Sequence, residues 1–158
     1  MHKLILIFFS FSLYAYALQF KETKYIEAFE LESHRYGSVS YENNQTIIHY
    51  KDGKIITKNG HVLTVENKKH TLLDTIDLRE KPQIALYFTL TQALFSKRFA
   101  LLEDNFNIKQ EKQIYYFLPK GSTAYIVNKI ELHLKKDGSV LYFVIDFKNK
   151  DNIKIEII

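Results

Sequence analysis

Polar and apolar residues alternate strictly near the C-terminal end of the chain. Ile130, Leu132 and Leu134 are separated by single charged or polar residues. This period of two predicts a β-strand with one apolar and one polar face. Asp137-Gly138 follows, and both residues tolerate the positive φ angles of a tight hairpin turn. The pattern therefore predicts a strand that turns back on itself at residues 137–138.

Two more strands are expected after this turn. Residues 140–147 are apolar on both faces, and isoleucine alternates with charged residues over 153–157. Together with the preceding strand they predict an antiparallel meander whose apolar side must be covered. The side chains of the middle strand expected to share one face are Leu141, Phe143, Ile145 and Phe147.

The first half of the chain also contains short strand patterns, and they are separated by turn residues such as Asp52-Gly53 and Asn59-Gly60. Strands this close together predict an up-and-down antiparallel sheet. The segment from Asp74 to Glu80 is acidic and irregular, and we expect no strand there. The predicted strands outside the C-terminal meander are 20–30, 36–41, 46–50, 54–58, 61–66, 69–73, 107–110 and 113–118.

A single helix interrupts these strands. Pro82 suits a first helical turn, and apolar residues recur at helical spacing from Ile84 to Phe95. Further apolar residues lie on another side, so this helix is apolar nearly all round and must be buried on most of its circumference. We expect it to act as a plug or lid on a curved sheet.

The predicted fold class is mainly β (α+β), with one domain over residues 18–158. The sheet carries more apolar surface than one helix can cover, so part of it could line a cavity that accepts an acyl chain. The alternative is an ordinary filled core. The cavity candidates are Tyr41, Ile48, Tyr50, Leu63, Val65, Tyr87, Phe88, Phe95, Tyr115, Phe117, Ile130, Leu132, Leu134, Phe143 and Ile145.

The N-terminus has the pattern of a signal peptide. Lys3 precedes an apolar run over residues 4–13, and Ala15-Tyr16-Ala17 matches a cleavage site. The run is shorter than the ~20 residues of a membrane span, which argues against an uncleaved anchor. The sequence therefore predicts cleavage after Ala17 and export to a Gram-negative periplasm.

Composition excludes several classes of site. The chain has no cysteine, which excludes disulfides, thiol nucleophiles and cysteine-based zinc sites. The net charge of +4 comes from scattered residues rather than a patch, so no nucleic-acid partner is expected. Lys68-Lys69-His70 is interpreted as a solvated turn. No catalytic motif is present, and a metal site of His49, His61 and His70 is disfavoured because histidines on a polar strand face are usually just exposed. We expect a non-enzyme without cofactor or metal.

Asn44 is a candidate modification site. Glu42 precedes Asn44 by two residues, and Thr46 follows it by two. This arrangement resembles the extended bacterial N-glycosylation sequon, in a predicted exposed turn.

The order of these elements resembles that of the LolA-like periplasmic carriers of outer-membrane lipoproteins. The resemblance implies an incomplete, strongly curved β-barrel with helices over its open side and a cavity for lipoprotein acyl chains. It also implies a monomer with an inner-membrane donor and an outer-membrane acceptor. The segments that carry it are 20–41, the hairpins through Val65, the helix ending near Phe95, Phe106–Gln110, Tyr116–Lys120 and Lys136–Val140.

The chain departs from that family's pattern in two places. Leu18 begins almost at the first strand, which leaves no room for the helix that usually precedes it. Glu42–Gln45 stands where the family has an Arg-Pro pair, and Arg35 cannot be equated with that arginine. The leading hypothesis is a periplasmic carrier of a lipoprotein or another lipid. The rivals are a non-catalytic envelope protein-interaction module with a filled core and a hydrolase with an unrecognised site.

Overall fold

The structure is a computed structural model that describes residues 17–158. The predicted signal peptide lies outside the described residues, except for its last residue, Ala17. The described part is dominated by strands. They are β1 (Leu18–Ile26), β2 (Leu31–Glu42), β3 (Gln45–Tyr50), β4 (Ile55–Asn59), β5 (Val62–Glu66), β6 (Leu72–Asp77), β7 (Phe106–Glu111), β8 (Ile114–Pro119), β9 (Val127–Leu134), β10 (Val140–Phe147) and β11 (Asn152–Ile157).

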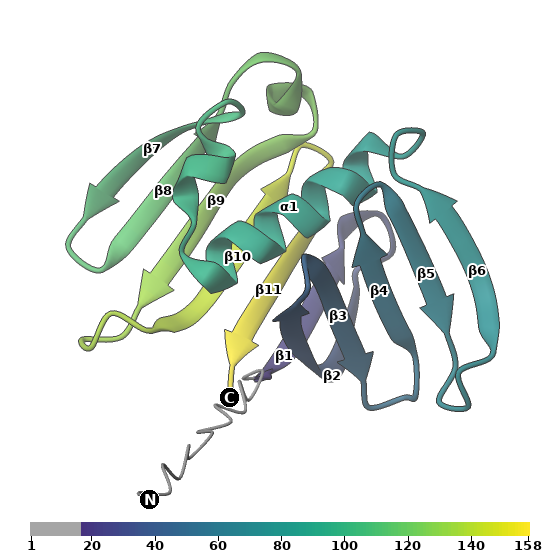
Figure 1. Cartoon of the computed structure of the whole chain (residues 1–158). Helices are drawn as coiled ribbons and strands as arrows, with labels where there is room; N and C mark the ends of the chain where they lie inside the picture. Colours follow the sequence, from purple (N-terminus) through teal and green to yellow (C-terminus); the bar gives the residue numbers. More distant parts are fainter. Residues whose placement is uncertain (1–16) are drawn as a thin grey trace, which may run out of the picture.

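All 11 strands form one antiparallel sheet in the order β6-β5-β4-β3-β2-β1-β11-β10-β9-β8-β7. Strands that follow one another in sequence pair with each other, except β6 and β7, and β1 also pairs with β11. The first and last strands therefore meet in the middle of the sheet, with an arm on either side. β6 and β7 are left as opposite edges, so the sheet is open (Figure 1). This confirms the predicted fold class.

The helix α1 (Pro82–Ser96) joins the two edge strands by crossing one face of the sheet (Figure 1). Pro82 occupies its first turn, where a missing N–H costs nothing. The helix ends where Lys97 adopts a left-handed conformation, with φ of 55°. Short 3-10 turns complete the described chain: η1 (Glu27–Phe29), η2 (Phe99–Leu102) and η3 (Gly121–Tyr125).

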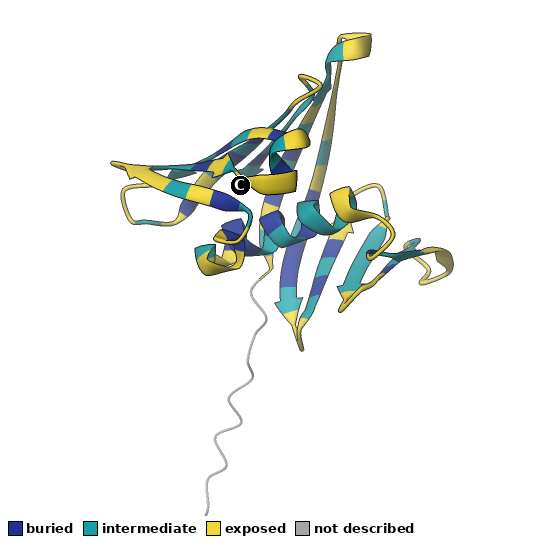
Figure 2. Cartoon of the chain, turned by 90° about the horizontal axis from the view of Figure 1, so that it is seen from above, coloured by how far each residue is buried: buried dark blue, intermediate teal, exposed yellow. Residues whose placement is uncertain are grey.

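The core lies between α1 and the face of the sheet that α1 crosses, which we call the inner face. Buried positions concentrate there (Figure 2). Gly37 shows how tightly this face is packed. A Cβ at that position would lie 2.6 Å from the His49 carbonyl oxygen and 2.9 Å from the Phe20 ring. Only glycine leaves room for the Phe20 ring to lie across β2.

The predicted strand over 69–73 and the absence of a strand after Asp74 are both wrong. Residues 67–71 form a turn in which the Asn67 side chain accepts hydrogen bonds from the N–H groups of Lys69 and Thr71. β6 then runs from Leu72 to Asp77. It is an edge strand and mostly exposed, so its acidic side chains remain in water and do not disfavour it.

Two expectations about strand faces and ends also need correction. The pairing of β9 with β10 shifts register between Val140 and Tyr142. This irregularity places Val140 in the core and leaves Leu141 40% exposed, so Leu141 does not share the face of Phe143. The strand predicted over 20–30 ends earlier, at Ile26, where η1 makes the turn into β2. Within residues 17–158, no helix is both long and apolar enough to cross a membrane.

Candidate functional site

The inner face places side chains from successive strands side by side. Across β1, β11, β10 and β9, one row runs Lys24, Ile153, Ile145, Ile130, and the next runs Glu22, Ile155, Phe143, Leu132. The second row is buried throughout, and in the first row Ile145 and Ile130 have no exposed surface. The inner face is thus apolar except for Glu22 and Lys24 in these rows, both on β1.

The predicted cavity residues all belong to the one hydrophobic core. Ten are buried: Ile48, Tyr50, Leu63, Phe88, Phe95, Phe117, Ile130, Leu132, Phe143 and Ile145. Tyr41, Val65, Tyr87, Tyr115 and Leu134 are partly buried and pack against them. The fold therefore brings these residues together, but most of them contact one another rather than an open space.

The centre of the inner face is filled by aromatic rings. Phe95 of α1 lies 5.4 Å from Phe143 and 6.3 Å from Phe20 between ring centroids. The apolar side of the C-terminal half of α1 is enclosed, since Leu90, Ala93 and Leu94 are at most 1% exposed. No acyl chain fits beneath this half of the helix while it stays in place.

The N-terminal half of α1 is covered less completely. Ile84, Ala85, Leu86 and Tyr87 are only partly buried. On one side of the helix a cleft of about 460 Å³ is lined by Leu78, Ala85, Leu86 and Ile126, among others. The helix therefore presents apolar surface to an open space along this half.

A second cleft lies on the other side of this half of α1. It has a volume of about 300 Å³ and is lined by Ile84, Tyr87, Phe147 and Ile153, with Lys24 among its polar residues. We call it the Lys24 cleft. A third cleft of about 400 Å³ shares Phe147 with the Lys24 cleft and Ile126 with the first.

Another cleft lies by the C-terminal end of α1. It has a volume of about 340 Å³, and Leu18, Phe95, Val140 and Ile157 form its apolar lining. Phe95 and Tyr87 are the two predicted cavity residues that line any of these clefts. The open apolar space of the described chain thus lies beside α1 rather than between its buried half and the sheet.

Polar contacts attach α1 to β1 and to the first arm of the sheet, which consists of β2 to β6. Glu22 is 8% exposed, and its Oε2 accepts hydrogen bonds from the hydroxyls of Tyr87 (2.9 Å) and Tyr50 (3.3 Å). The hydroxyl of Tyr41 donates to the backbone carbonyl of Thr91 at 3.2 Å. Burial raises the pKa of all three tyrosines, and the nearby Glu22 charge raises the pKa of Tyr50 and Tyr87 further.

Arg35 occupies the position on β2 next to Glu22. Its guanidinium lies over the Tyr50 ring, 3.6 Å from the centroid, and donates to Asp52 at 2.9 Å. The pKa of Asp52 is lowered, first by the Lys54 backbone N–H and then by Arg35. Arg35 thus holds the ring of Tyr50 in place, and the hydroxyl of Tyr50 donates a hydrogen bond to Glu22.

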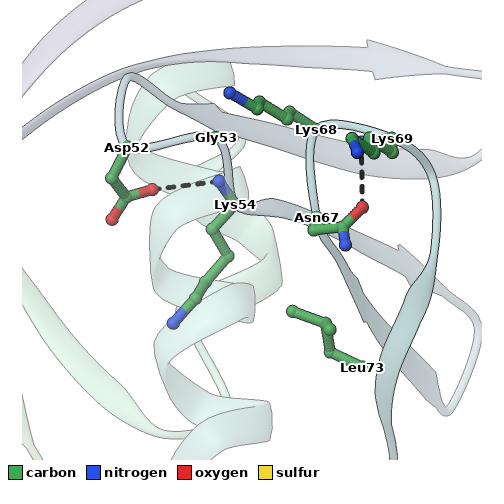
Figure 3. A pocket seen from close by; sticks show the side chains of 7 residues that line it. All are labelled: Asp52, Gly53, Lys54, Asn67, Lys68, Lys69 and Leu73. Carbon is green, nitrogen blue, oxygen red and sulfur yellow. Dashed lines mark hydrogen bonds between the residues drawn. The ribbon is translucent and has the colours of Figure 1, made fainter.

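A further cleft, of about 490 Å³, lies elsewhere. It is formed between the β3–β4 and β5–β6 turns, and Lys54, Lys68 and Lys69 are exposed around it (Figure 3). Leu73 is its only large apolar side chain. It is a notch between two hairpins, and none of its lining residues lies on α1.

The remaining sequence candidates do not add a site. Among the residues that the structure describes, no group of three or more histidine, cysteine, aspartate or glutamate residues could hold a metal ion, so His49, His61 and His70 do not form one. Asn44 is exposed at the β2–β3 turn, with φ of 63°, whereas Thr46 is buried. Lys68 to His70 lie in an exposed turn, as predicted.

Comparison with known proteins gives only a loose structural similarity. No protein family matches the chain, and no curated protein matches its sequence. The solved structure of a LolA superfamily protein from Nitrosomonas europaea is similar at 10% identity, with 89% of this chain and 83% of that chain covered and a TM-score of 0.37. A likeness this loose carries no argument about what the chain binds.

Proposed function

We propose that the protein binds an acyl chain of a lipid or lipoprotein in the clefts beside the N-terminal half of α1. The observation that carries this proposal is the incomplete cover of that half. Apolar side chains of the helix face clefts on both of its long sides, at Leu86 and at Ile84. An acyl chain in either cleft would bury this surface.

The energetics favour an apolar occupant. Each methylene group removed from water contributes about 0.8 kcal/mol. Clefts of about 300 and 460 Å³ are within the range of small-molecule sites in proteins, roughly 300–1,000 Å³. A longer chain would need α1 to move off the inner face, where Ile145 and Ile130 continue the row that starts in the Lys24 cleft.

The cellular role follows from the predicted export of the chain. A periplasmic protein that shields an acyl chain from water is suited to carrying a lipid or lipoprotein towards the outer membrane. Such a carrier would take its cargo from an inner-membrane donor and pass it to an outer-membrane acceptor. The role rests on the targeting pattern in residues 1–17 together with the clefts.

Native mass spectrometry and a fluorescent acyl probe test the binding directly. Protein purified gently from its own cells should carry lipid, and lipid-free protein should take up the probe. Ala85→Phe would fill the cleft beside Leu86 and should weaken probe binding about fivefold or more.

Ala28→Phe is the matched control, because Ala28 is exposed in η1 and lines none of the clefts described above. This variant should bind the probe like the original protein. Protein that neither carries lipid nor takes up the probe would contradict the proposal.

A filled core favours one alternative function. The rings packed around Phe95 leave no space beneath the C-terminal half of α1, as in a protein whose sheet only presents a surface. A non-catalytic envelope interaction module of this kind would be free of lipid. It would also capture a stoichiometric protein partner in a pull-down, and acyl probes would not compete with that partner.

A further inference from the structure

Lys24 is a charged residue on the inner face, at one of the clefts beside α1. It alternates with Phe20 and Glu22 along β1, so its side chain belongs to the apolar side of the sheet. Some strand lysines pair with a carboxylate two residues away, as Lys129 does with Glu131 at 2.7 Å and Lys154 with Glu156 at 2.9 Å. Lys58 on β4 shares the inner face with Lys24 and also makes no ion pair within the described chain, but it lines none of the clefts described above. Within residues 17–158, Lys24 makes no ion pair or side-chain hydrogen bond, although it is exposed at the cleft.

The surroundings of Lys24 are amphipathic. Its neighbour on β11 is Ile153, which lines the same cleft as Ile84 and Phe147. The row then continues through Ile145 on β10. If the Lys24 ammonium held a charged group, apolar side chains would therefore lie next to that group on one side, the side towards the helix.

The carboxylates near this ammonium are already hydrogen-bonded. Asp151 also lines the cleft, but its two oxygens accept from the Glu27 N–H at 3.0 Å and from the Asn149 amide at 2.8 Å. The Oε2 atom of Glu22, the next residue on the inner face, accepts from two tyrosines. Lys24 is thus the charged side chain at this cleft that makes no hydrogen bond within the described chain, whereas Asp151 accepts two.

We infer that the Lys24 cleft binds a single-chain amphiphile with an anionic headgroup, a carboxylate or a phosphate. The headgroup pairs with the Lys24 ammonium, and the first methylenes of the chain contact Ile153 and Phe147. This inference rests on the proposed function, since it assigns the headgroup chemistry of the same site. The anion is favoured over a cation because it can accept hydrogen bonds from the Lys24 ammonium, which has no acceptor within the described chain.

Titration calorimetry with four dodecyl compounds, each below its micelle concentration, tests the inference. Dodecanoate and dodecyl phosphate separate the two anionic headgroups, dodecyl maltoside is neutral, and dodecyltrimethylammonium is cationic. The original protein should bind at least one anion more tightly than the neutral and cationic compounds. Lys24→Gln should weaken the binding of that anion about fivefold and leave the binding of dodecyl maltoside unchanged.

Two further variants act as controls. Lys21→Gln removes a lysine from the same strand but from the opposite face, and should not change binding. Lys24→Arg keeps the charge and should retain the preference for the anion. Equal binding of all four compounds, or a Lys24→Gln variant as selective as the original, would overturn the inference and leave acyl binding intact. Binding of none of them would overturn both.

Discussion

Glu22 is the one buried charged residue among those that the structure describes. A carboxylate removed from water is costly unless donors compensate it. Tyr50 and Tyr87 supply two hydroxyl donors to the same oxygen. Because Tyr87 lies on α1 and Glu22 on β1, this compensation also holds the helix against the sheet.

The Tyr87→Phe variant should lower the free energy of unfolding by about 1–3 kcal/mol. The ring stays, but the buried Glu22 carboxylate loses the nearer of its two donors. Urea denaturation followed by circular dichroism measures the change. Tyr125→Phe is the matched control, since Tyr125 is 86% exposed. Removing its hydroxyl should change the free energy of unfolding by no more than about 0.5 kcal/mol. Equal effects of the two variants would refute this role for Tyr87.

Residues of the inner face show how much can be predicted from local sequence patterns. Val39 and Ile48 are recognisable as core residues from alternation alone, and both are buried. Glu22 and Lys24 were not predicted to lie on the inner face, because charged residues in a strand are normally assigned to its polar face. Their alternation with Leu18 and Phe20 was the available signal. Only the pairing of β1 with β11 reveals that they lie on the inner face.

At the scale of the element, α1 has two unlike halves. Leu90 and Leu94 are at most 1% exposed, whereas Leu86 is only partly buried beside an open cleft. The apolar pattern of the sequence is similar in both halves. The difference arises from what packs on them, since the turn η2 (Phe99–Leu102) follows directly and its Leu102 is fully buried.

Replacing a leucine by alanine should therefore lower the stability of the protein by unequal amounts in the two halves. Leu94→Ala leaves a cavity in a closed core and should cost about 2–5 kcal/mol of stability. Leu86→Ala enlarges a space that is already open, and should cost about 1 kcal/mol or less. Midpoints of urea unfolding for the two variants provide the comparison. Comparable losses would mean that the N-terminal half is packed as closely as the C-terminal half.

At the scale of the molecule, one buried and two partly buried tyrosines link α1, β1 and the first arm of the sheet. Tyr41 donates to Thr91, Tyr87 donates to Glu22, and Tyr50 donates to the same carboxylate. Burial raises the pKa of each hydroxyl above its ordinary value of about 10. The contact between α1 and the arm therefore depends on these hydroxyls keeping their protons.

Stability should fall as the pH rises above about 10. The folded pKa of each tyrosine is higher than the unfolded one, so the stabilising contribution is complete below pH 10. Above it, the unfolded chain loses protons first, and each tyrosine removes up to about 1.4 kcal/mol per pH unit. Urea midpoints between pH 9 and 11 measure the slope. Tyr41→Phe should make the slope shallower than in the original protein; identical slopes in the two proteins would contradict the prediction.

The sequence by itself determined the kind and order of most elements. Strict alternation located β9 and β11, the apolar run located β10, and helical spacing after Pro82 located α1. These features are periodicities of neighbouring residues, so they are visible without any long-range information. The strand β6 was missed because an exposed edge strand needs no apolar face.

Only the tertiary structure decided how much of the inner face is hollow. The pairing of β1 with β11 joins residues from opposite ends of the described chain, and no local pattern specifies it. The same holds for the aromatic contacts of Phe95, which fill the centre, and for the clefts beside Ile84 and Leu86. Whether an apolar surface is covered depends on packing between residues that are far apart in the sequence. Alternation along the chain does not predict such packing.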